Sequence, residues 1–191
     1  MERQKPLQST MVYCSPIFRV YEDEVERPKG GTGKVSRIDH RRTVSVVPVR
    51  DNGSVVMIRQ YRPAVGHYLL EIPAGRVDHD AESSEACAQR EMAEEIGHRA
   101  EKLVKLFEGY LVPGYGNEYM YYYLAVGLYP EPLPPDEDED IEALEMPLEA
   151  VLQMVRTAGI TDSKTALGIL LAVDYLKRHR MPPYHEGPDR P

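Results

Sequence analysis

The feature that most constrains this chain is the run Arg90–Gly97, REMAEEIG, which places three carboxylates within five residues of a predicted helix. At 3.6 residues per turn, Glu91 and Glu95 lie one turn apart and Glu94 lies beside Glu95, so all three project from one face. Glu91 and Glu95 repel each other, and the negative end of the helix dipole disfavours each anion by roughly 0.3–1 kcal/mol. We therefore expect a cation at this face.

Two interpretations of the acidic face compete. A bound divalent cation would remove the repulsion, and oxygen ligands without a neighbouring His or Cys suit Mg2+, with Mn2+ as the alternative. A solvated acidic surface is the commoner fate of an isolated Glu-Glu pair. The residues before the run favour the metal, because the segment 71–75 (EIPAG) is followed by Glu82 and, after seven further residues, by Arg90.

This order resembles the Nudix box of the pyrophosphohydrolase superfamily, which is a glycine, five residues, a glutamate, seven residues, and then Arg-Glu-apolar-X-Glu-Glu-X-Gly. From Glu82 to Gly97 the match is complete. Six residues, instead of five, separate Gly75 from Glu82, so the loop carries a one-residue insertion and Ala81 occupies the strict glutamate position. We expect the loop to absorb the insertion, because loops tolerate insertions better than helices do.

Features outside the box point to one branch, since they are similar to the ADP-ribose pyrophosphatase group. Pro113 lies sixteen residues past Gly97, as in that group, and Gly114 and Glu118 follow it. The other shared segments are RQYR at 59–62, EIPAG at 71–75, the acidic run 136–140 and the segment 160–165. Together these features cover about residues 40 to 178, and their common order makes chance agreement improbable.

The resemblance implies an α/β/α sandwich around a mixed β-sheet. We expect an N-terminal strand region at 1–40, with its first ten residues disordered, a Nudix hydrolase domain at 41–180 and a disordered tail at 181–191. In the resembling group the N-terminal region builds a homodimer, and composition alone does not show a dimer here.

Local patterns predict the elements of this domain. β-rich runs at 43–49 and 55–61 are joined through Asn52-Gly53, a strong hairpin signal. Residues 82–96 are predicted to form a helix that Gly97 ends, and Asp162 is a predicted N-cap. The remaining predicted elements are strands at 102–110 and 118–128, a helix that starts after Pro147, and a last helix after Asp162.

The resemblance also assigns roles to individual residues. Metal ions are expected on Glu91, Glu95, the Ala74 carbonyl and Glu139. The catalytic set is Glu137 as general base, with Glu94 and Arg90. For the acidic run 136–140, a merely solvated turn remains the alternative.

Substrate contacts follow in the same way. Arg62 matches an arginine that contacts the diphosphate, and Glu118 matches a residue that binds the terminal ribose, although a surface ion pair explains either alone. Phe18 is the candidate for stacking on the base, with plain packing as the alternative. The remaining candidates are Gly75, Pro113 and Gly114 for substrate binding, and Tyr13 and Tyr21 as rivals of Phe18.

Composition excludes several classes of function. The net charge of -8 argues against a nucleic-acid polymer as partner, because such binding requires an excess of Lys and Arg. No apolar run approaches the roughly 20 residues that span a bilayer, and the first ten residues lack the apolar core of a signal peptide. We expect a cytoplasmic protein that takes a small-molecule substrate.

Three functions remain open. The first is Mg2+-dependent hydrolysis of ADP-ribose to AMP and ribose 5-phosphate. The second is the same reaction on another nucleoside diphosphate sugar, such as GDP-mannose or ADP-glucose, or on an oxidised nucleotide. The third is a catalytically inactive nucleotide-binding regulatory domain, which need not retain all three glutamates of the box.

Overall fold

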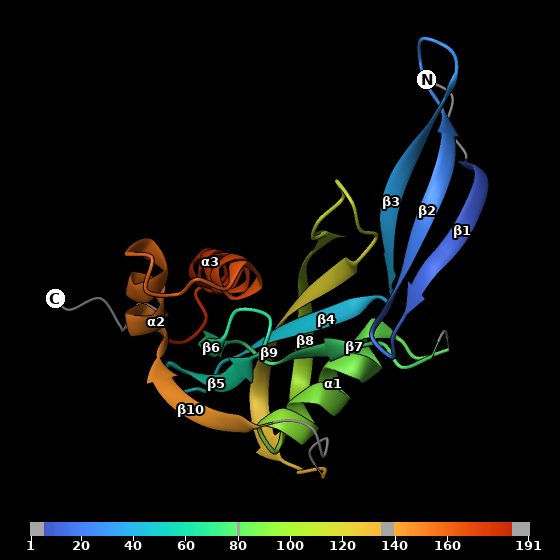
Figure 1. The fold of residues 1–191 in the computed structure, drawn as a ribbon. Coiled ribbons are helices and arrows are strands. Elements are labelled where there is room, and N and C mark those ends of the chain that lie inside the picture. The colour runs from blue at the N-terminus through green and yellow to red at the C-terminus, as the bar shows by residue number, and fades with distance from the viewer. Residues whose placement is uncertain (1–5, 80, 135–139, 185–191) are drawn as a thin grey trace, which may run out of the picture. The chain divides into compact units, whose positions relative to one another are not determined.

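The computed structural model describes residues 6–79, 81–134 and 140–184. They form two compact units (Figure 1). The first comprises the described residues up to Arg42 together with Gly109–Met120, and the second comprises the described residues of Thr43–Glu108 and those from Tyr121 onward. Residues 109–120 therefore group with the N-terminal strands in this division of the chain.

The first unit is an antiparallel sheet in the order β1-β2-β3, formed by β1 (Pro6–Cys14), β2 (Phe18–Glu26) and β3 (Thr32–His40). Residues 109–120 join this unit through β3, because Ile38 donates its N–H to the Tyr115 carbonyl at 2.7 Å and accepts from the Asn117 N–H at 3.2 Å. These long-range bonds are invisible to local sequence patterns.

Both predicted disordered ends are partly ordered. Residues 6–10, which sequence analysis expected to be disordered, belong to β1, where pairing with β2 satisfies their backbone groups. At the other end, Tyr184 donates its O–H to Glu149 Oε2 at 2.9 Å, which holds residues 181–184 against the helix Leu148–Arg156. Residues 6–10 pair with β2, and residues 181–184 form backbone hydrogen bonds from Met181 to Leu176 and from Tyr184 to Met181.

The second unit contains two sheets, in the orders β10-β5-β6 and β7-β4-β9-β8. The strands are β4 (Thr43–Pro48), β5 (Ser54–Arg62), β6 (His67–Glu71), β7 (Ala74–Arg76), β8 (His98–Tyr110), β9 (Tyr119–Pro130) and β10 (Ile141–Pro147). The helices are α1 (Ser84–Glu95), α2 (Leu148–Arg156) and α3 (Ser163–Arg178). Within the described ranges, none of them is long and apolar enough to cross a membrane.

Strand β4 is buried on both faces, and this defines the layers. Val44 and Val46 pack in one core cluster with Met92 of α1, whereas Val47 packs in a second cluster with Ile169 of α3. Successive side chains of a strand point to opposite faces, so α1 covers one face, and α2 and α3 lie on the other side (Figure 1). The predicted α/β/α sandwich is confirmed.

The predicted hairpin at Asn52-Gly53 is only half correct. The turn is present, with Gly53 at a φ of 82° and its N–H donating to the Arg50 carbonyl at 2.9 Å. The strands on either side nevertheless belong to different sheets, and only an isolated bridge joins Val49 to Val55. Strand β5 pairs with β10 and β6 instead, and its apolar residues are buried in the core clusters on the two faces of the sheet.

The ends of α1 and α3 agree with the predicted signals. Ser83 caps α1 by accepting from the Ala86 N–H at 3.1 Å, and Gly97 follows the helix at a φ of 68°. Asp162 caps α3 by accepting from the Thr165 N–H at 3.0 Å. The Asp162 and Gly97 predictions are therefore confirmed.

We predict that Gly168→Ala destabilises the fold by about 1 kcal/mol. An added Cβ would lie 2.7 Å from Ile72 Cδ1 and 3.3 Å from Val47 Cγ2, so overpacking costs about 1–3 kcal/mol, while the better helix propensity of Ala returns up to about 1 kcal/mol. Urea unfolding measures the change, and Leu170→Ala, at an exposed position of the same helix, should shift stability by less than about 0.5 kcal/mol. A stabilised Gly168→Ala variant would contradict the close packing of α3.

Candidate active site

Arg90 supplies positive charge at the acidic face of α1. Its Nη1 donates to Glu91 Oε1 and to Glu94 Oε2, both at 2.9 Å. Partial burial opposes the charged form of Arg90, but the hydrogen bond with Glu82 and the charge of Glu91 prevail, so the pKa of Arg90 lies above its ordinary value. Arg90, a residue of the same helix, therefore supplies part of the positive charge that the sequence predicts at this face.

Glu82 keeps its place in the site despite the inserted residue. Its Oε1 accepts from Arg90 Nε at 3.1 Å, and its Oε2 accepts from the Asp78 N–H at 2.8 Å. Burial acts to raise the pKa of Glu82, but the bonds from Arg90 and Asp78 outweigh it and hold the pKa below the ordinary value. Ala81, which occupies the strict motif position, is exposed. Glu82, and not Ala81, therefore pairs with Arg90 in the structure.

The start of β7 touches two of the three helix carboxylates. Ala74 donates its N–H to Glu95 Oε2 at 3.0 Å. A Cβ built at Gly75 would overlap the carboxyl group of Glu91, so that group occupies the space left by the missing side chain. Glu91 and Glu95 are both buried, at 9% and 8% exposure. The backbone of residues 74 and 75 thus positions both carboxylates.

The donor chemistry of this face fits a hard divalent cation, because Glu91, Glu94 and Glu95 offer only oxygen. Their side chains do not converge as a ligand set, since Glu91 and Glu94 turn toward Arg90 while Glu95 binds the Ala74 N–H. No group of three or more His, Cys, Asp or Glu side chains is placed to hold a metal within residues 6–79, 81–134 and 140–184. The predicted base Glu137 and ligand Glu139 lie outside the described residues.

A buried ionic cluster lies at the end of β6. Arg62 binds Glu71 with two parallel bonds, Nε to Oε1 at 2.7 Å and Nη2 to Oε2 at 2.8 Å. Lys164 donates to Glu71 as well, and to Asp162 Oδ2 at 2.9 Å. Burial acts to raise the pKa of Glu71, but Arg62 and Lys164 outweigh it and hold that pKa below its ordinary value.

Sequence reasoning missed Glu71 and Lys164 as site residues. The available signal was that Glu71 stands alone among apolar neighbours in the segment 69–73, and it is only 1% exposed in the structure. A buried carboxylate requires a cationic or hydrogen-bonding partner. That rule predicts a partner without identifying Lys164, which lies 93 residues away.

In the first unit, two predicted substrate residues line one cavity. Pro113 and Gly114 border a space of about 670 Å³ together with Arg37 and Tyr110. Small-molecule sites have volumes of about 300–1,000 Å³, so this cavity is of adequate size. Glu118 does not line it, and its carbonyl accepts from the Leu111 N–H at 3.1 Å. The roles of Pro113, Gly114 and Glu118 stay predictions.

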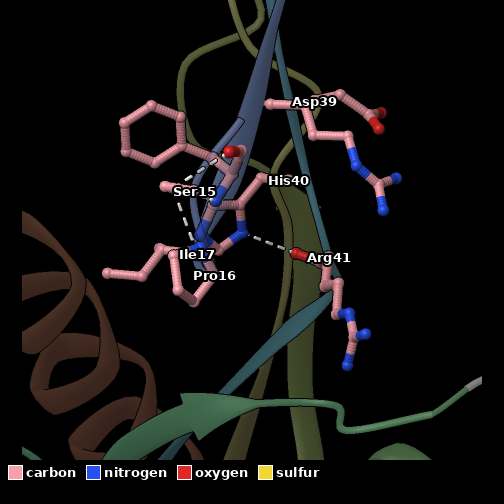
Figure 2. A pocket seen from close by; sticks show the side chains of 8 residues that line it. Ser15, Pro16, Ile17, Asp39, His40 and Arg41 are labelled. Carbon is pink, nitrogen blue, oxygen red and sulfur yellow. Dashed lines mark hydrogen bonds between the residues drawn. The ribbon is translucent and has the colours of Figure 1, made fainter. Parts of the chain in front are cut away.

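Phe18 borders a second and smaller cavity, of about 110 Å³, which Figure 2 shows around Ser15, His40 and Arg41. Ser15 Oγ accepts from the backbone N–H of Phe18 at 3.0 Å, and His40 Nδ1 lies 2.7 Å from the Arg41 carbonyl. This space is below the usual size of a ligand pocket. Base stacking by Phe18 therefore stays a prediction, as it does for Tyr13, whose ring centroid lies 5.9 Å away.

An α/β/α sandwich whose helix carries Arg90-bridged carboxylates beside Gly75 is the architecture expected of a Nudix hydrolase. The family model described as "NUDIX domain" matches residues 39–165, well over half of the chain. The chain therefore belongs to the Nudix family, and the resemblance seen in the sequence is confirmed.

Individual relatives lie within the same family. The chain is 33% identical to the ADP-ribose pyrophosphatase of Bacillus subtilis (strain 168) over 87% of this chain and 90% of that protein. It is 37% identical to the GDP-mannose pyrophosphatase of Yersinia pestis (strain Pestoides F) over 70% of this chain and 69% of the relative. A crystal structure of an ADP compounds hydrolase matches with a TM-score of 0.83 and 26% identity, covering 94% of this chain and 97% of that one.

We predict that Gly75→Ala raises the Mg2+ concentration needed for half-maximal activity and lowers kcat. The new methyl group would displace the Glu91 carboxyl group from its present position. Activity titrated against Mg2+ measures both effects, and circular dichroism checks the fold. Gly159→Ala is the matched control, since its Cβ would approach no atom closer than 3.4 Å. A Gly75→Ala enzyme with the Mg2+ dependence of the wild type would refute the positioning role.

We predict that Glu71→Gln costs about 3 kcal/mol of stability at pH 7, the low end of the range for a broken buried ion pair, because Arg62 loses its counter-charge but is partly solvated and Lys164 keeps its bond to Asp162. Since the folded-state pKa of Glu71 lies below the ordinary value of about 4.3, its contribution is present above that value and is lost as the pH falls through the folded pKa. The difference in the free energy of unfolding between Glu71→Gln and the wild type should therefore decrease only below about pH 4.

Urea unfolding at pH 7 and at steps from pH 5 to pH 3 tests this dependence. Glu142→Gln is the control, because Glu142 forms an exposed pair with Arg59 at 2.8 Å, and we expect a change below about 0.5 kcal/mol. A constant difference between Glu71→Gln and the wild type over the whole pH range would show that the Glu71 charge is not what stabilises the cluster.

Proposed function

We propose that this Nudix hydrolase is an Mg2+-dependent pyrophosphohydrolase that cleaves the diphosphate of ADP-ribose to AMP and ribose 5-phosphate. The observation that carries the proposal is the face of α1, where Glu91, Glu94 and Glu95 lie against Arg90 and the Ala74-Gly75 backbone. The similarity to an ADP-ribose pyrophosphatase over most of the chain supports this choice of substrate.

The chemistry requires charge neutralisation, because the anionic oxygens of a diphosphate repel a nucleophile. Glu91, Glu95, the Ala74 carbonyl and Glu139 would hold the Mg2+ ions. Bound Mg2+ would screen the phosphates and lower the pKa of a water molecule. Arg90 holds two of the helix carboxylates close together through its bonds to Glu91 and Glu94.

The remaining catalytic and binding roles are proposed from the motif. Glu137 would accept the proton from the attacking water, and Glu94 is the next candidate. Arg62 would contact the diphosphate, since its bidentate bond to Glu71 fixes the plane of the guanidinium while its side chain stays 37% exposed. Pro113, Gly114, Glu118 and Phe18 would contact the rest of the substrate.

A second candidate substrate is GDP-mannose, and the 37% identity to a GDP-mannose pyrophosphatase favours it specifically. ADP-glucose and oxidised nucleotides require the same diphosphate chemistry. An inactive regulatory domain is disfavoured, because Glu91, Glu94 and Glu95 are all present and hydrogen-bonded.

We also propose a cytoplasmic homodimer, formed through the N-terminal sheet. Every residue of β1 is exposed, including the apolar side chains of Leu7, Met11, Val12 and Tyr13. Several exposed apolar side chains on one strand favour an interface between protein chains.

Release of AMP across a panel of ADP-ribose, ADP-glucose, GDP-mannose and nucleoside triphosphates tests the function. We expect ADP-ribose to give the highest kcat/KM, and EDTA to abolish activity. Glu95→Gln should remove turnover without loss of stability, because Arg90 still bridges Glu91 and Glu94. Activity that survives EDTA would overturn the mechanism, and a preference for triphosphates would overturn the substrate.

A further inference from the structure

The cluster at the end of β6 combines two cations and two anions. Glu71 accepts from Arg62 and from Lys164, and Lys164 also donates to Asp162, the N-cap of α3. Glu71 and Lys164 are well shielded from solvent, with side chains 1% and 13% exposed. With both carboxylates ionised, the formal charges of the four groups sum to zero.

Arg62 is the member of the cluster that faces outward. Its side chain is 37% exposed, whereas the bonds of Lys164 are directed inward to Glu71 and Asp162. The pKa of Arg62 is raised first by the hydrogen bond with Glu71, against an opposing effect of burial, and further by the charges of Glu71, Glu95 and Asp162. The cluster and the carboxylate face of α1 therefore share one electrostatic environment.

Without Lys164 the cluster would carry a formal charge of -1, and the anionic substrate would meet that charge beside the acidic face of α1. In a poorly solvated region a unit charge acts over several ångströms with little screening. The charge of Glu71 would then cancel the charge of Arg62, and the negative charge of Asp162 would have no cation to balance it.

We propose that Lys164 is a positioning residue for binding of the substrate's diphosphate, acting through Glu71 and Arg62 by balancing the negative charge of Glu71 and Asp162. The inference rests on the proposed function of Arg62. Lys164 does not touch the substrate, and its contribution lies in the sum of charges beneath Arg62. This role explains why Lys164 pairs with Glu71, although the two residues lie 93 positions apart in the sequence.

Variants that change the charge sum in opposite directions test the proposal. Lys164→Met gives -1, Asp162→Asn gives +1, and the double variant Asp162→Asn/Lys164→Met restores zero without restoring a cation at residue 164. Asn is as good an N-cap as Asp, so α3 keeps its cap. Lys105→Met is the matched control, because it removes the same charge from an exposed pair with Glu108.

We expect Lys164→Met to raise KM for ADP-ribose about tenfold at low ionic strength with kcat within about twofold, as for loss of uniform binding. Asp162→Asn should lower KM severalfold, the double variant should return close to the wild type, and Lys105→Met should change nothing. Added salt should reduce the differences. The dissociation constants of inorganic diphosphate, measured in the presence of Mg2+ by calorimetry, should rank the variants in the same order as their KM values for ADP-ribose.

The outcomes separate the two proposals. A wild type that releases no AMP refutes the proposed function, and the diphosphate affinities of the wild type and the four variants still decide the role of Lys164. An active wild type with unchanged KM in Lys164→Met, or a double variant that stays as weak as Lys164→Met, refutes the charge-balancing role. If Lys164→Met does not fold, the KM of Asp162→Asn for ADP-ribose tests the inference. A lower KM than that of the wild type supports the role of Lys164, and an unchanged or higher KM overturns it.

Discussion

The site depends on one steric and electrostatic constraint, which is that a charged glutamate on α1 must be buried against the chain that enters β7. The Glu91 carboxyl group fits only because residue 75 has no side chain, and Arg90 provides its counter-charge. A buried carboxylate without a partner would cost several kcal/mol, so the helix, the glycine and the arginine are required together. The same packing brings Glu95 to the Ala74 N–H and fixes the distance between α1 and β7.

Much of this arrangement could be predicted from the sequence, because it is governed by local rules. The spacing of residues 90–97 sets three carboxylates on one helical face, and capping residues set the ends of α1 and α3. The β-rich run at 43–49 predicted a strand, and β4 (Thr43–Pro48) occupies that run. Even the inserted residue before Glu82 follows a local rule, since a loop absorbed it.

Interactions between distant segments could not be predicted in this way. Residues 43–49 and 55–61 look like two arms of a hairpin, but β4 pairs with β7, at Ser45 opposite Ala74, while β5 pairs with β10. The choice between partners depends on which apolar faces are covered elsewhere, and no local pattern contains that information. The partner of Glu71 on α3 was hidden for the same reason, whereas the need for a partner was visible.

The N-terminus of α3 stabilises the helix and also positions the backbone next to the carboxylates of α1. Thr165 Oγ1 accepts from the Ile72 N–H at 2.9 Å and donates to Asp162 Oδ2 at 2.5 Å, so the helix cap also holds the backbone that leads to Ala74. That backbone is held at its other end by Glu95 on α1. Two helices on opposite sides of the sheet therefore fix one short segment, and a change in either helix can move the carboxylates. Asp162 caps α3, and Thr165 joins this cap to the backbone next to the carboxylates. A substitution that stabilises the helix at these positions can therefore shift the carboxylates, which is the usual conflict between stability and activity.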